Sequence, residues 1–167
     1  SSKGKRRSSH AHVGAHGLHG SLGRQSCRIF DGPESNFLST TRETKMTAVN
    51  MSEDAAIRAT IQHYLDGARL GKGDLMKPAF AEGATIFGYV GPDLFAGPIQ
   101  GLFDWNDQNG PAKDIVSAIT SIEVVETIAV ARVESDNWTG HRFSDFFTLL
   151  KLDGQWKIMS KVFHLHA

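Results

Sequence analysis

A carboxylate among aromatic residues is the feature of this sequence best suited to chemistry. Asp145 stands in the stretch FSDFFTLLKLDGQWKIMSKVFH, residues 143–164. Enzymes transfer protons mostly through His, Asp, Glu, Lys or Tyr side chains held within hydrogen-bond reach of the reacting group. Tyr64 and His164 are the residues of these types that we expect to pack near Asp145. A catalytic site here would let Asp145 and His164 exchange a proton while Tyr64 polarises an oxygen.

The same residues also have purely structural interpretations. A buried acid is almost always paired with donors, whatever its purpose, so Asp145 is equally a structural acid satisfied by Tyr64, His164 or a backbone N–H. An inward tyrosine is more often part of a core or pocket wall than a catalyst. His166 stands one residue from the end of the chain, where fraying is expected.

A hairpin is expected to position Asp145. Asp153–Gly154 is a two-residue turn signal between two strand-like runs, which places Leu152 opposite Gln155. The inward-facing pairs are then Lys151–Trp156, Leu149–Ile158, Phe147–Ser160, Asp145–Val162 and Phe143–His164. The outward-facing pairs are Leu150–Lys157, Thr148–Met159, Phe146–Lys161 and Ser144–Phe163. A slip by one residue would reverse every facing.

The other elements follow an order of helices first and strands second. Ser52 is expected to cap a helix that ends near residues 71–73, with an apolar stripe that includes Tyr64 and leaves His63 outside. A short helix over 73–83, a strand over 84–91 and a helix over 98–109 follow. Strands are expected over 115–125, 128–134, 141–150 and 156–164, as an antiparallel meander. This order predicts an α+β fold.

Residues 1–45 differ from the rest of the chain. They are rich in Ser, Gly, His and Arg and lack apolar periodicity, so we expect a weakly ordered leader or tail before a single domain over 46–167. The histidines at positions 10, 12, 16 and 19 have irregular spacing and no Cys or acid partner, which is weak evidence for a metal site. A targeting segment is the minority interpretation.

Charge and cysteine content exclude several classes of function. The chain has 18 basic and 18 acidic residues, but eight of the basic and three of the acidic ones lie in residues 1–45. The remainder is acidic, which argues against a nucleic-acid surface. Cys27 is the one cysteine, so no internal disulfide is possible and a cytoplasmic location is the simplest expectation. No apolar run is long enough for a membrane span.

The order of elements, with GATIFG at 83–88 and the terminal FSDFFTLLKLDGQWKIMSKVFH, resembles the nuclear transport factor 2-like superfamily. The SnoaL-like or lumazine-binding-like branch is the nearest match in pattern. The resemblance covers residues 52–167 and implies a cone, in which a strongly curved sheet wraps around three helices and leaves a pocket at the wide end. It also implies homodimers through the outer face of the sheet. It does not imply one activity, because the superfamily includes isomerases, dehydratases, cyclases and binding domains.

The resemblance removes one activity and suggests a pocket. In ketosteroid isomerases the general base lies on the strand similar to residues 84–91, and that position is Gly88 here. Tyr64 matches the tyrosine that donates to the oxyanion in those enzymes. The residues predicted to contact a flat or cyclic hydrophobic ligand are Phe87, Tyr89, Trp105, Phe143, Phe147 and Ser160.

Three functions are compatible with the sequence. The first is a small-molecule-binding protein with a hydrophobic pocket. The second is a cofactor-free isomerase, dehydratase or cyclase-type enzyme that uses Asp145, His164 and Tyr64 on a small hydrophobic carbonyl or hydroxyl compound. The third is a non-catalytic dimeric interaction domain with a filled cone. No nucleotide-binding, metal-binding or cofactor motif occurs in residues 46–167.

Overall fold

The computed structural model describes residues 34–167, with the side chains of residue 41, residues 43–45 and residues 51–167. The helices are α1 (Glu34–Leu70), α2 (Gly73–Met76), the single 3-10 turn η1 (Lys77–Ala79) and α3 (Gln100–Asn109). The strands are β1 (Phe80–Val90), β2 (Asp93–Pro98), β3 (Val116–Val125), β4 (Ile128–Trp138), β5 (His141–Leu152) and β6 (Gln155–Leu165). Cys27 and the four histidines at positions 10–19 lie outside the described residues.

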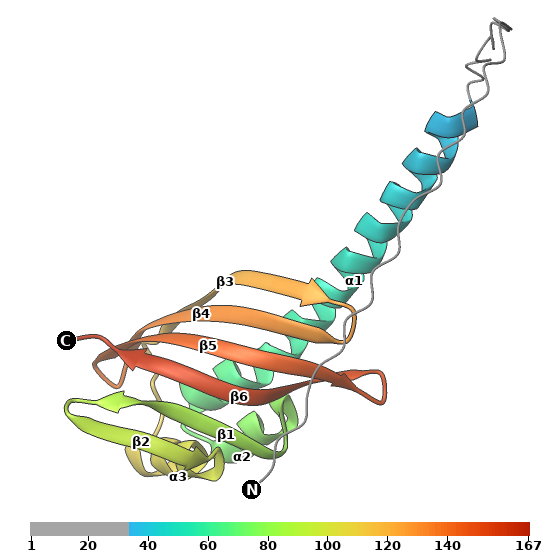
Figure 1. Ribbon diagram of the computed structural model, residues 1–167. Coiled ribbons are helices and arrows are strands. Elements are labelled where there is room, and N and C mark those ends of the chain that lie inside the picture. Colours follow the sequence, from blue (N-terminus) through green and yellow to red (C-terminus); the bar gives the residue numbers. More distant parts are fainter. Residues whose placement is uncertain (1–33) are drawn as a thin grey trace, which may run out of the picture.

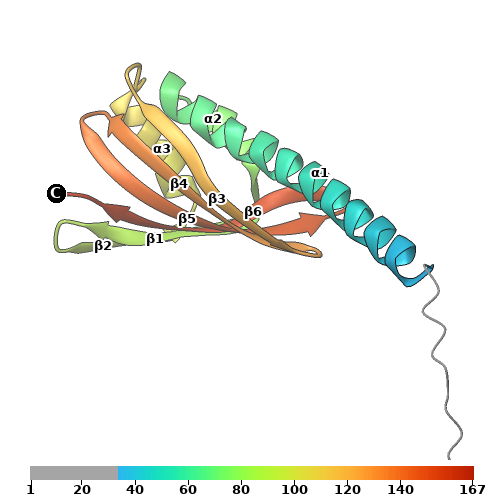
Figure 2. The ribbon, with the colours of Figure 1, turned by 90° about the horizontal axis from the view of Figure 1, so that it is seen from above.

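The strands form one sheet in the order β2-β1-β6-β5-β4-β3. β1 runs parallel to β6, and every other neighbouring pair is antiparallel. The sheet is strongly curved, and α2, α3 and the C-terminal half of α1 lie against its inner side (Figures 1 and 2). The predicted α+β fold with a curved sheet wrapped around helices is therefore confirmed.

The core forms where α1 meets the concave side of the sheet. Ile57, Ile61, Tyr64 and Ala68 recur every three or four residues along α1 and are fully buried, whereas His63 is exposed. This spacing places them on one stripe of the helix. The inward stripe predicted from the sequence is confirmed, and it directs the Tyr64 hydroxyl toward the sheet.

The first helix begins earlier than predicted. α1 starts at Glu34, so Ser52 lies inside the helix and does not cap it. The reason is visible in the sequence, because residues 34–66 contain neither Gly nor Pro and nothing interrupts the helix. The predicted domain boundary after residue 45 falls within α1, and its role as a boundary stays a prediction.

One strand of the sheet was not predicted from the sequence. β2 pairs with β1 through a tight hairpin whose closing pair is Val90 and Asp93. Gly91 adopts a φ of 59°, which glycine tolerates without strain, so the chain reverses there at once. The short helical segment after α1 is also shorter than the predicted range 73–83, because β1 already begins at Phe80.

A bulge changes the register of the hairpin between β5 and β6. The predicted pairs hold from Leu152–Gln155 to Leu149–Ile158, but Thr148 then pairs with Ser160 and leaves Met159 as an extra residue on β6. A β-bulge of this kind reverses the facing of all later residues on its strand. The predicted pairs Phe147–Ser160, Asp145–Val162 and Phe143–His164 are therefore wrong. The observed partners are Phe147–Lys161, Asp145–Phe163 and Phe143–Leu165.

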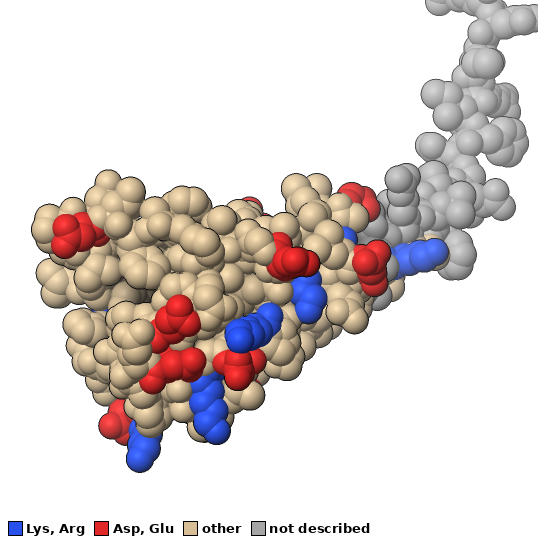
Figure 3. Space-filling model, turned by 90° about the horizontal axis from the view of Figure 1, so that it is seen from below, with Lys and Arg blue, Asp and Glu red and all other residues tan. Residues whose placement is uncertain are grey.

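Charges of both signs share the surface. On the side seen from below in Figure 1, acidic and basic side chains lie interspersed (Figure 3). Lys77–Asp74 and Arg58–Asp54 are exposed ion pairs of the helical part of the chain. None of the helices in the described part of the chain is long and apolar enough to span a membrane.

Candidate functional site

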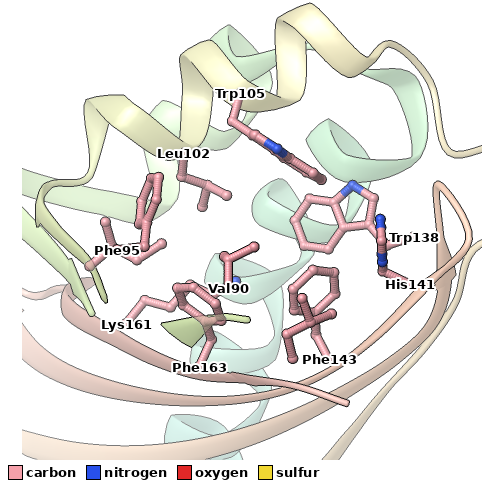
Figure 4. Close-up of a pocket in the computed structure, with 11 residues that line it drawn as sticks. Val90, Phe95, Leu102, Trp105, Trp138, His141, Phe143, Lys161 and Phe163 are labelled. Carbon is pink, nitrogen blue, oxygen red and sulfur yellow. The ribbon is translucent and has the colours of Figure 1, made fainter. Parts of the chain in front are cut away.

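A pocket of about 130 Å³ lies between α3 and the concave side of the sheet. Its wall is almost entirely apolar and aromatic (Figure 4). The lining residues are Ile86, Val90, Phe95, Leu102, Trp105, Trp138, His141, Phe143, Lys161, Phe163 and Leu165. Val90 and His141 are exposed and mark the mouth, whereas Lys161 is 2% exposed and lies deep in the site.

Each wall of the pocket comes from a different element. Leu102 and Trp105 stand three residues apart on α3 and point toward the sheet (Figure 4). Trp138 closes one end from the last position of β4, and its ring meets Trp105 edge-on at 5.7 Å between centroids. Phe143 and Phe163 form the sheet side, with centroids 6.0 Å apart. Edge-to-face contacts of this kind hold the rings in fixed positions, so the pocket is preformed.

Three polar side chains meet behind the pocket. The Tyr64 hydroxyl donates to Asp145 Oδ2 at 2.6 Å, and Lys161 Nζ donates to Tyr64 Oη at 2.8 Å. Lys161 Nζ also lies 3.0 Å from Asp145 Oδ2. None of the three side chains is more than 2% exposed. Within the described part of the chain, Asp145 Oδ1 has no hydrogen-bond partner.

Burial sets the protonation of this triad. Loss of solvation lowers the pKa of Lys161, and the negative charge of Asp145 opposes that shift. Burial raises the pKa of Tyr64 well above its usual value, and Asp145 adds to the effect, so the phenol remains a neutral donor. The pair of Lys161 and Asp145 is thus a buried ion pair whose cation is easier to deprotonate than a surface lysine.

Four aromatic rings surround the Lys161 amine. Nζ lies 4.9 Å from the centroid of Tyr64, 5.2 Å from Trp138, 5.5 Å from Phe163 and 5.9 Å from Phe143. Ring faces attract cations within about 6 Å, so this cage stabilises a positive charge at Nζ. Three of these rings also line the pocket. A ligand that reaches Lys161 therefore meets a cationic group in an apolar wall.

The structure brings together two of the three residues predicted to be catalytic. Asp145 is buried on the inner face, as predicted, and Tyr64 bonds directly to it. His164 is exposed and lies opposite Ser144 on the outer face, with its ring 4.8 Å from that of His166. The predicted proton exchange between Asp145 and His164 is wrong, because the bulge turns His164 away from the pocket. Lys161 takes the inward place instead.

The residues predicted to contact a ligand are divided among the pocket, the core and the surface. Trp105 and Phe143 line the pocket. Phe147 lies in the core, with its ring 5.2 Å from Tyr64, and Ser160 bonds to the Thr85 hydroxyl at 3.2 Å.

Phe87 and Tyr89, two further predicted contacts, are 42% and 59% exposed and lie outside the pocket. Their predicted place in the pocket is wrong, because β1 alternates and turns Ile86, Gly88 and Val90 inward instead.

Two residues at the site were not predicted from the sequence. Trp138 lies beyond the strand predicted over 128–134 and was not among the predicted pocket residues, but it is 1% exposed and lines the pocket. Lys161 was placed on the outer face, and it lies at the centre of the triad. The apolar residues of β6 contain a usable signal, because they change from even positions at Trp156 and Ile158 to odd positions at Phe163 and Leu165. Such a change of parity indicates a bulge between them.

Gly88 lies where the resemblance places the isomerase base. A Cβ built at this position would lie 2.5 Å from two ring carbons of Phe163, so the aromatic ring fills the space beside the strand. A carboxylate at this position would not fit without displacing that ring. Asp145, on β5, is the carboxylate that the site offers instead.

No group of three His, Cys, Asp or Glu side chains in the described residues is arranged to hold a metal ion.

Fold and pocket together define an NTF2-like protein, with a curved sheet, three helices and an apolar cavity between them. The chain belongs to the family described as "Putative lumazine-binding", whose model matches residues 52–164. A solved NTF2-like protein of unknown function from Methylobacillus flagellatus KT is 53% identical, with a TM-score of 0.68, over 70% of this chain and 94% of that one. Another solved NTF2-like protein of unknown function, from Shewanella baltica OS155, is 42% identical, with a TM-score of 0.68, over 70% of this chain and 96% of that one.

A curated relative has a name that describes a reaction. The chain is 32% identical over 117 residues to the protein named aldolase FrzH from Cladobotryum sp.. The match covers 70% of this chain and 94% of that protein.

Proposed function

We propose that this protein binds a small, mainly hydrophobic molecule that carries a carbonyl or hydroxyl oxygen. The observation that supports the proposal is an apolar pocket with one buried amine in its wall, Lys161. Apolar walls bind the body of such a ligand, and few polar groups orient it. The ligand oxygen accepts a hydrogen bond from Lys161 Nζ, whose charge is held in place by Asp145 and Tyr64.

The size of the pocket limits the ligand. A cavity of ~150 Å³ is about large enough for benzene, so the 130 Å³ pocket suits one ring, with any larger part of the molecule extending from the mouth. Lumazine itself is a bicyclic compound with several amide-type donors and acceptors. The polar groups of the lining residues are the Lys161 amine, the His141 imidazole and the indole N–H groups of Trp105 and Trp138, so a less polar ligand fits the wall better.

A calorimetric titration tests binding at this site. Single-ring ketones and alcohols should bind, and ring hydrocarbons of the same size should bind more weakly because they lack the oxygen. Val90→Trp, at the mouth, should reduce the affinity by blocking entry. Val130→Trp is the matched control. Val130 is 44% exposed, close to the 47% of Val90, but it lies on the outer face of the sheet. Equal affinities in the two variants would contradict the proposed site.

Catalysis is the second candidate function, and the triad favours it. An aldol reaction starts with loss of a proton beside a carbonyl group, and the relative named as an aldolase makes a carbonyl compound a reasonable substrate class. Lys161 separates Asp145 from the pocket, so Lys161 is the group that touches the substrate. Asp145 accepts a proton from the amine, and Tyr64 donates to the same carboxylate.

Deuterium exchange tests this second candidate. The protein should catalyse exchange at the carbon beside the carbonyl of a bound ring ketone, followed by NMR in heavy water. Asp145→Asn should reduce the exchange rate about 10²-fold or more while the ketone still binds. Binding without any catalysed exchange would leave the protein as a binding protein alone.

We further propose that the protein forms a homodimer through the outer face of the sheet. Phe87, Val162 and Phe146 are neighbours across β1, β6 and β5, and each is 42–50% exposed. A continuous apolar row of this kind on a sheet is typical of a contact between two copies. Phe163 and Lys161 were predicted to belong to this face and do not, because the bulge turns them inward. The cytoplasmic location stays a prediction.

A further inference from the structure

We propose that Lys161 is a covalent site, where the amine condenses with the carbonyl group of the ligand to form a Schiff base. The inference rests on the proposed function, and it names the ligand class more narrowly as an aldehyde or ketone. A hydroxyl compound would bind in the pocket but would not react in this way.

The position of Lys161 separates it from the other lysines of the domain. The bulge in β6 turns its side chain into the pocket wall, and Nζ lies among rings of which three line the cavity. Lys157, on the same strand, donates instead to the Pro78 carbonyl at the surface. Lys151 pairs with Glu53 at 2.7 Å. Lys161 is the only lysine among the described residues that lines the pocket.

The residues around Nζ can carry the proton through the condensation. Asp145 Oδ2, 3.0 Å from Nζ, takes one proton from the ammonium and leaves a neutral amine. The nitrogen lone pair then forms a bond to the carbonyl carbon as the C=O π bond breaks, and a second proton passes from the nitrogen to the oxygen, which becomes a hydroxyl. Asp145 returns its proton to that oxygen, the C–O bond breaks, and one water molecule leaves. One ammonium and one carbonyl thus yield one iminium ion and one water, with no change of charge or oxidation state.

The site also suits the product of this reaction. An iminium nitrogen retains the positive charge, so the Asp145 carboxylate and the surrounding rings remain suitable partners. Water can leave toward the mouth, where Val90 and His141 are exposed. Burial also lowers the pKa of Lys161, which increases the fraction of neutral amine at neutral pH relative to a surface lysine.

Reductive trapping tests the inference on the full chain. Benzaldehyde is the probe, because it is a single-ring aldehyde without an acidic carbon, and sodium cyanoborohydride reduces any imine to a stable secondary amine. Peptide mass mapping at neutral pH should show faster labelling of Lys161 than of Lys157, since burial lowers the pKa of Lys161 and the pocket holds the aldehyde beside its amine. Asp145→Asn leaves more of the amine neutral but removes the group that returns a proton to the departing oxygen, so it should slow labelling of Lys161 and leave labelling of Lys157 unchanged.

Two variants separate failure of this inference from failure of the proposed function. Lys161→Arg retains a cation but cannot form a stable imine, and Lys161→Met lacks the amine. Calorimetry without the reductant should show that the wild type binds benzaldehyde and that Lys161→Arg binds it more weakly, with no label at position 161. Wild-type labelling of Lys161 no faster than that of Lys157 would overturn the inference, whether or not the aldehyde binds. Absence of benzaldehyde binding in the wild type and in Lys161→Arg would count against the proposed function as well.

Discussion

Removal of the Lys161 amine should destabilise the protein strongly. In Lys161→Met the methionine is a reasonable apolar replacement in a cage of rings, so loss of packing is small. The Asp145 carboxylate, which is fully buried, would keep only the Tyr64 hydroxyl as a partner. Breaking a buried ion pair by removing one member costs about 3–5 kcal/mol, and we expect a loss of this size.

A second substitution should recover much of this loss. In the double variant Lys161→Met with Asp145→Leu, no charge remains in the triad. The remaining defect is the Tyr64 hydroxyl, which loses both of its partners. One buried unsatisfied hydroxyl costs about 1–3 kcal/mol, so the double variant should be more stable than Lys161→Met alone.

Urea denaturation of the wild type, both single variants and the double variant measures these free energies. The single variants are Lys161→Met and Asp145→Leu. The sum of their two losses in the free energy of unfolding should exceed the loss in the double variant by at least about 2 kcal/mol. Lys157→Met is the control on the same strand. Loss of the partly exposed Lys157 amine should lower the free energy of unfolding by only about 0.5 kcal/mol. Losses that add up in the double variant would refute the view that Lys161 and Asp145 act as a pair.

Three more outcomes follow from the structure. Burial lowers the pKa of Lys161 from its usual value of 10.5, so between the folded pKa and 10.5 the unfolded chain binds more protons than the folded protein. The free energy of unfolding of the wild type, measured by urea titration relative to that of Lys161→Met, should therefore rise with pH across this window. Gly88→Ala should push the Phe163 ring into the pocket and weaken ligand binding in calorimetry, an effect that Phe163→Leu should relieve. Phe146→Lys should convert the dimer to monomer in light scattering, whereas Val116→Lys, at an exposed position on the edge strand β3, should not; a wild type that is monomeric would contradict the dimer.

The parts of the fold that depend on local patterning were predictable. The apolar stripe of α1, the burial of Asp145 and the turn at Asp153–Gly154 follow from spacing and turn residues, and the structure confirms them. The start of α1 was not predictable in the same way, because Ser52 is an acceptable cap as well as an acceptable interior residue. A strong local signal therefore located the elements, but it did not fix all of their ends.

The site was only half predictable, for a reason of register. One extra residue at Met159 exchanges the two faces of the second half of β6, so the pattern that places Asp145 correctly places Lys161 and His164 wrongly. A turn fixes register only as far as the strands stay regular. Trp138 illustrates a second reason. It lies beside a Gly-containing turn, and it is buried through contacts with Tyr64, Trp105 and Phe143 from other elements.

The most direct test of binding at Lys161 is a crystal structure of the protein soaked with a single-ring ketone. We expect electron density for the ring between Trp105 and Phe143, with the ketone carbon bonded to Lys161 Nζ or the ketone oxygen within hydrogen-bond distance of it. An empty pocket at saturating ketone, or a ligand seated on the outer face beside Phe87 and Phe146, would contradict the proposed site.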